Sequence, residues 1–78
     1  MRITLRGALD ISSARARFDE LRVQEVAHEV ELGEVDAIDA AGLQLLGWLR
    51  ARDPGRVRFL DTPQVLRETF TFLGLKDW

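Results

Sequence analysis

Cysteine is absent from this chain of 78 residues, so no disulfide can stabilise it and no thiolate can bind a metal ion. His28 is the only histidine, and one histidine without cysteine cannot build a zinc site. No apolar run is long enough to span a membrane, and no secretory signal follows Met1. The sequence therefore predicts a cytoplasmic protein that inserts into no membrane and holds no metal or other cofactor.

A catalytic set of residues is also missing. Asp36 and Asp39 lie three residues apart and could imitate an acid/base pair, but no nucleophile or second base accompanies them. We interpret Asp39 as a helix cap and Asp36 as a solvated turn residue. Gly33 and Gly42 have the spacing of neither of the usual phosphate-binding loops. The sequence predicts that the protein is not an enzyme.

Length and charge limit the remaining function classes. A chain of this size forms one small domain, residues 1–78, with a limited core and little stability to spare. Hydrophobic residues make up 46% of it and charged residues 31%, as in ordinary globular domains. The net charge of −2 gives no reason to expect nucleic-acid binding.

The hydrophobic pattern alternates between strand and helix three times. We expect strands over residues 2–6, 25–32 and 57–60. We expect helices from Ser12 or Ser13, as the cap, to about Arg22, from Asp39 to about Arg52, and from Pro63 to near Gly74. Such alternation predicts an α/β fold of the order β-α-β-α-β-α. Its three to four strands should be mostly parallel, with the helices mainly on one face of the sheet.

The polar faces of the strands predict the strand order. Glutamates point outward from the second expected strand, whereas the first and third strands carry outward arginines. Opposite charges on neighbouring strands are favourable, so the acidic strand should lie between the two basic ones. The residues concerned are Arg2, Arg6, Glu29, Glu31, Arg56 and Arg58. On the opposite face of the second strand, His28 falls among Val26, Val30 and Leu32, which predicts a packed core histidine.

Residues 35–46 contain the most informative local pattern. An apolar strand end runs into Asp39, whose side chain can accept hydrogen bonds from free N–H groups at the start of a helix. Ala40 and Ala41 follow in the first turn, where the helix dipole favours anions. Neither alanine has a hydroxyl group that could be modified.

Four segments in sequence order resemble the STAS domain, the module of anti-sigma-factor antagonists and of the cytoplasmic tails of sulfate transporters. The resemblance spans nearly the whole chain and implies a non-catalytic α/β interaction module. The segments are Gly7-Ala8-Leu9-Asp10-Ile11, the expected turn Leu32-Gly33-Glu34-Val35, the helix start Asp39-Ala40-Ala41-Gly42-Leu43, and residues 57–63 with Leu73-Gly74-Leu75.

The chain departs from this family in two respects. Antagonists in the family are switched by phosphorylation of a serine or threonine that follows the motif aspartate, and Ala40 and Ala41 provide no acceptor. The resemblance therefore implies a surface that stays in the unphosphorylated state. The chain also begins at the position of the family's second strand, so we expect an incomplete sheet with open edges.

Trp48 marks the surface that we expect to bind a partner. It shares a helical stripe with Ala41, Gln44 and Arg52, and tryptophan and arginine are enriched at binding hot spots. The alternative is that Trp48 packs against the last helix near Phe70 or Leu73. Trp78 could likewise close the core or fray. The partner-binding residues predicted from the sequence are Asp39, Ala40, Ala41, Gly42, Gln44 and Trp48.

The sequence leaves three kinds of partner open. The resemblance implies an anti-sigma kinase-like protein or another signalling protein. A similar resemblance around residues 40–46 is to the STAS-like accessory subunit of a lipid-transporting ABC complex, which docks on the ATPase. The third possibility is a purely structural homodimer that buries the charged face of the sheet.

Overall fold

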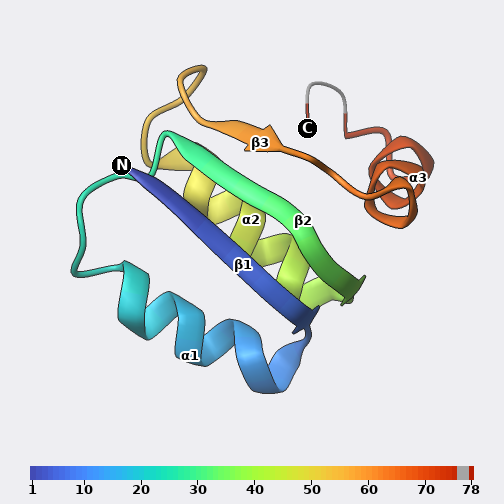
Figure 1. The fold of residues 1–78 in the computed structure, drawn as a ribbon, viewed down its shortest axis with the longest axis horizontal. Coiled ribbons are helices and arrows are strands. Elements are labelled where there is room, and N and C mark those ends of the chain that lie inside the picture. The colour runs from blue at the N-terminus through green and yellow to red at the C-terminus, as the bar shows by residue number, and fades with distance from the viewer. Residues whose placement is uncertain (76–77) are drawn as a thin grey trace.

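The computed structural model describes residues 1–75 and residue 78, and in them strands and helices alternate as expected (Figure 1). The α/β prediction is confirmed. The six elements are β1 (Arg2–Leu9), α1 (Ile11–Leu21), β2 (Glu29–Ile38), α2 (Ala40–Ala51), β3 (Arg58–Leu60) and α3 (Gln64–Phe72). No helix in the described residues is long and apolar enough to cross a membrane.

The three strands form one parallel sheet in the order β1-β2-β3, so the acidic strand lies in the middle as predicted. Ion pairs link it to both neighbours. Arg2 pairs with Glu31. Arg6 Nε lies 3.0 Å from Glu34, and Arg58 Nη2 lies 3.6 Å from Glu29. These pairs are largely exposed, so each contributes little to stability, but together they favour this strand order over the alternatives.

The expected turn at Leu32-Gly33-Glu34-Val35 is wrong, because β2 continues through it to Ile38. The strand absorbs two additional residues as irregularities in its pairing with β1. Thr4 pairs with Glu31 but Arg6 with Glu34, and Gly7 pairs with Val35 but Ala8 with Ala37. A bulge keeps the pairing while it changes which face a side chain occupies. Leu32 and Val35 are therefore both buried although they are three residues apart, and Asp36 is exposed within a strand rather than in a turn.

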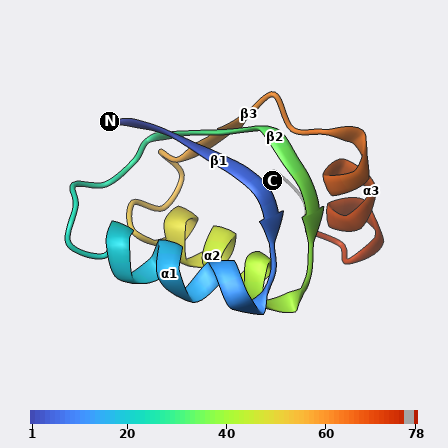
Figure 2. The ribbon, with the colours of Figure 1, turned by 60° about the horizontal axis from the view of Figure 1, so that its bottom comes forward.

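Helices α1 and α2 lie side by side on one face of the sheet, and α3 packs against β2 (Figure 2). The core lies between these layers. Its fully buried side chains are Leu9, Val30, Leu32, Leu46, Leu49 and Leu66. Trp78 packs edge-on to Phe59 and Phe70, at centroid distances of 5.8 Å and 5.3 Å. Of the two alternatives for this residue, packing against the core is the one observed.

The prediction that His28 is a core residue is wrong. Strand β2 begins one residue later, at Glu29, so the strand alternation does not extend to the histidine. Its side chain is 46% exposed, and Nε2 lies 2.7 Å from Oδ2 of Asp53. This polar contact joins the start of β2 to the turn after α2.

Asp10, not Ser12 or Ser13, caps α1. Its carboxylate accepts hydrogen bonds from the backbone N–H groups of both serines, while the Ser13 hydroxyl accepts one from the backbone N–H of Asp10. The two serines had the right spacing for a cap, but an aspartate one position before the helix competes for the same donors. At the other end of the chain, Pro63 occupies the N-cap position of α3 without a capping hydrogen bond from its side chain, and the helix itself begins at Gln64.

Candidate functional site

Asp39 joins the starts of the two helices that cover the sheet. Its Oδ1 accepts a hydrogen bond from the backbone N–H of Gly42 at 3.1 Å, which caps α2 as predicted. Its Oδ2 accepts a second bond, at 3.2 Å, from the backbone N–H of Ile11 at the start of α1. Its own N–H donates to the carbonyl of Leu9 at the end of β1. One carboxylate therefore fixes where both helices begin.

Gly42 and Ala40 differ sharply in their surroundings. Gly42 is buried, and a Cβ atom there would lie 2.7 Å from Ile38 Cγ1 and 2.8 Å from Leu9 Cβ. The glycine allows α2 to approach the sheet closely, which is a structural role rather than a binding role. Ala40, two residues earlier, is exposed.

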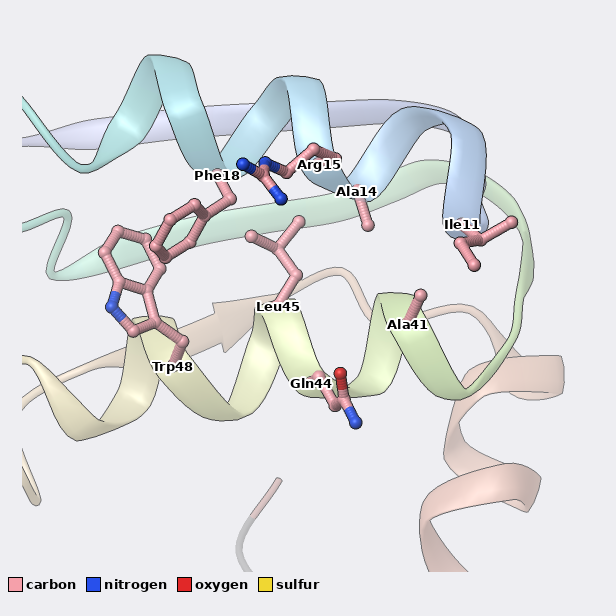
Figure 3. A pocket seen from close by; sticks show the side chains of 8 residues that line it. All are labelled: Ile11, Ala14, Arg15, Phe18, Ala41, Gln44, Leu45 and Trp48. Carbon is pink, nitrogen blue, oxygen red and sulfur yellow. The ribbon is translucent and has the colours of Figure 1, made fainter.

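A groove runs between α1 and α2, with a volume of about 340 Å³ (Figure 3). Three of the residues that we predicted to bind a partner, Ala41, Gln44 and Trp48, line its α2 side. The other lining residues are Ile11, Ala14, Arg15, Phe18 and Leu45. The two helices start at the same end, so Ile11 lies near Ala41 at one end of the groove and Phe18 lies near Trp48 at the other.

Trp48 closes the far end of this groove. Its ring packs edge-on to Phe18, with centroids 4.7 Å apart, and the Arg52 guanidinium lies 4.8 Å from the centroid of the Trp48 ring. Arg52 is held there by hydrogen bonds to the carbonyls of Leu21 and Gln24. The tryptophan is half-buried, and its aromatic partner is α1, not α3 as the alternative interpretation had it.

The comparisons with known proteins agree with this architecture. A protein-family model described as "Mlab, STAS domain" matches residues 1–77. The chain belongs to the STAS domain family. No curated protein and no solved structure matches it.

The groove of this STAS domain has the chemistry of a contact surface. Its walls are mostly apolar, and Ile11 at its end is 78% exposed. Arg15 and Gln44 supply polar edges, and Arg15 Nε lies 3.3 Å from the Asp19 carboxylate one turn along α1. In the described residues, no group of histidine and acidic side chains could hold a metal ion. Membership of the STAS family is itself consistent with a non-catalytic interaction module.

Sequence reasoning missed the α1 half of the groove in this STAS domain. Ile11 and Phe18 share one apolar stripe of their helix, a pattern typical of a core face, although Ile11 is exposed. A signal was present in the sequence, since Asp10 and Asp39 each follow a buried strand end and precede a helix. In a parallel sheet, two such turns on neighbouring strands lie side by side, so the helices that follow them must be neighbours.

Proposed function

We propose that this STAS domain is a non-catalytic module that binds a helix of a protein partner in the groove between α1 and α2. The observation that supports this most directly is the exposed Ile11 beside an apolar groove that ends at Trp48. A partner that covered this side chain, 78% exposed, would remove its apolar surface from water, and that burial would favour binding.

A partner helix suits the shape of the groove. Two helices that start together and lie side by side leave a lengthwise channel between them, into which side chains at helical spacing can insert. Phe18 and Trp48 provide an aromatic wall for an apolar anchor residue, and tryptophan is common at such hot spots. Arg15 and Gln44 at the rim provide hydrogen-bond donors for polar groups around the anchor.

The residues in the first turn of α2 support binding that is not switched by phosphorylation. Phosphorylation regulates an interface by adding charge and bulk, and neither Ala40 nor Ala41 can accept a phosphoryl group. We therefore propose that binding at this groove is not switched by modification of the Asp39 turn.

Two classes of cytoplasmic bacterial partner are candidates. The first is an anti-sigma kinase-like signalling protein, which would make the domain an anti-sigma-factor antagonist that acts in transcription regulation. The second is the ATPase of an ABC-type lipid transport complex, which would make the domain an accessory subunit. The family description "Mlab, STAS domain" names neither partner, so both candidates are tested.

The test is to purify the domain with each candidate partner, namely a kinase-like protein or an ABC ATPase encoded beside its gene, and to measure the dissociation constant by titration calorimetry. We expect Trp48→Ala and Ala41→Asp each to weaken binding by about tenfold or more. Ala16→Asp is the matched control, because Ala16 is exposed on α1 and does not line the groove.

The two variants differ in their effect on packing. Trp48→Ala removes a packing partner of Phe18 as well as a binding residue, whereas Ala41→Asp changes the groove without a loss of core volume. Thermal unfolding of both variants shows whether a weakened affinity comes from unfolding. If folded Ala41→Asp binds the partner as tightly as Ala16→Asp does, the groove is not the interface.

A further inference from the structure

The segment that leads from the end of α2 into β3 is rich in arginine. The chain has a net charge of −2, yet residues 50–58 contain four arginines and one aspartate. Arg52 donates hydrogen bonds to two backbone carbonyls and lies over the Trp48 ring. The Asp53 carboxylate contacts the His28 ring. Among the described residues, Arg50 and Arg56 form no ion pair, and Arg58 has only its contact with Glu29.

Arg50 and Arg58 line the same hollow from different elements. Arg50 comes from the last turn of α2 and Arg58 from β3, and the hollow between them has a volume of about 450 Å³. Its remaining walls are Gly55, Val57, Phe59 and Trp78. We call this the β3 hollow. It is separate from the groove between α1 and α2, with which it shares no lining residue.

Aromatic rings orient the Arg50 side chain. Its guanidinium carbon lies 5.5 Å from the centroid of Phe59 and 5.7 Å from that of Trp78. Stacking of this kind holds the guanidinium plane and leaves the N–H groups at its edges available for a carboxylate. Among the described residues, no carboxylate lies within 4.0 Å of Arg50, and Arg58, 71% exposed, has only the 3.6 Å contact with Glu29.

The open edge of strand β3 can also bind the backbone of a partner segment. It pairs with β2 on one side only, since the strand order is β1-β2-β3. In Figure 1 it forms the upper border of the sheet, with no described helix or strand along its outer side. An exposed strand edge presents unpaired N–H and C=O groups to which an extended segment can hydrogen-bond.

We propose that the β3 hollow binds an extended acidic segment of a partner protein, which adds to the edge of β3 and places carboxylates on Arg50 and Arg58. Neighbouring side chains of an extended segment point to opposite faces of the sheet. Arg58 lies on the face of the ion pairs, and Arg50 lies with Phe59 on the helix side. Two consecutive acidic residues therefore reach the two arginines at once.

The proposal does not depend on the function of the groove and is tested without its partner. The probe is a fluorescein-labelled peptide that repeats Glu-Asp-Val-Thr, titrated with the whole chain at about 50 mM salt, where charge interactions are little screened. The matched peptide replaces Glu and Asp with Gln and Asn. We expect saturable binding of the acidic peptide and none of the amide peptide.

Protein variants locate the binding. Arg50→Gln and Arg58→Gln together should weaken binding by about tenfold or more, because each charge-assisted pair is lost. Arg6→Gln is the matched control, since Arg6 also pairs with a glutamate of β2 but at the opposite edge of the sheet. Amide resonances of β3 should shift on titration in the native chain.

Three results would overturn the proposal. The first is no saturable binding of the acidic peptide. The second is an equal loss of affinity in Arg6→Gln, which would mean general charge attraction. The third is resonance shifts confined to the groove between α1 and α2. A single-stranded oligonucleotide that binds more tightly than the peptide, with the same dependence on Arg50 and Arg58, would replace the acidic protein segment with nucleic acid as the occupant.

Discussion

Gly42 lies so close to the carbonyl oxygen of Leu9 that no side-chain carbon fits between helix α2 and the end of β1. A Cβ atom at this position would also meet Ile38 Cγ1 at 2.7 Å. The obstructing carbonyl belongs to the backbone and cannot rotate away. We expect Gly42→Ala to lower the free energy of unfolding by about 3 kcal/mol, measured by urea denaturation, because the helix must move away from the sheet.

Gly47 in the same helix provides the control for this prediction. A Cβ atom there would lie 3.4 Å from the nearest atom of Trp78, an ordinary contact distance. Alanine has the higher helix propensity, so Gly47→Ala should raise the free energy of unfolding by about 0.5–1 kcal/mol. Equal effects of the two substitutions would contradict the close approach of α2 to β1.

Asp39 should contribute more to stability than an ordinary helix cap. Asp39→Ala leaves the N–H groups of both Gly42 and Ile11 without their acceptor, so we expect a loss of about 2 kcal/mol in chemical denaturation. Asp36→Ala removes an exposed carboxylate of β2 and should change stability by less than about 0.5 kcal/mol. A similar loss in both variants would mean that charge, not capping, is responsible.

Asp10 should titrate below its ordinary pKa. A hydrogen bond from the Ser12 hydroxyl, followed by those from the backbone N–H groups of Ser13 and Ser12, lowers the pKa of Asp10 from 3.8. A folded pKa below the unfolded value stabilises the fold above about pH 4, and this stabilisation is lost as the pH falls through the folded pKa. NMR titration should show that Ser12→Ala raises the pKa of Asp10. An unchanged titration would exclude the hydroxyl as the main cause.

The groove variant Ala41→Asp should remain folded. Ala41 lies in the first turn of α2, where a carboxylate interacts favourably with the helix dipole, and it is only partly buried. The favourable dipole term and the partial desolvation of the new charge oppose each other, so thermal unfolding should give a change of less than about 1 kcal/mol. A much larger loss would mean that Ala41 belongs to the core, and Ala16→Asp would then fail to match it as a control.

The element order and the strand order could be predicted because they depend on patterns within single segments. Asp39 and the arginines and glutamates of the strands each carried a local signal that the structure preserves. The length of β2 could not be predicted, since Gly33 indicates a turn or a bulge with equal force, and only pairing with β1 decides between them. The same holds for Trp48, whose contact with Phe18 depends on which helices become neighbours.

The α1 half of the candidate site was missed for a related reason. The expected cap at Ser12 or Ser13 placed the helix start too late, and it hid the parallel between Asp10 and Asp39. Once both aspartates are seen to end neighbouring strands, Ile11 and Ala40 become equivalent positions, the first residues of the two helices. The hydrogen bond from Ile11 to Asp39 then follows from the topology.

The positions of the two tryptophans have an experimental consequence. The chain has only Trp48 and Trp78, and one lines the groove while the other lines the β3 hollow. Each proposed surface therefore contains its own intrinsic fluorophore. Replacing either indole by phenylalanine leaves a chain whose emission reports on one surface alone, so occupancy of the two surfaces can be followed separately in the same protein without any label.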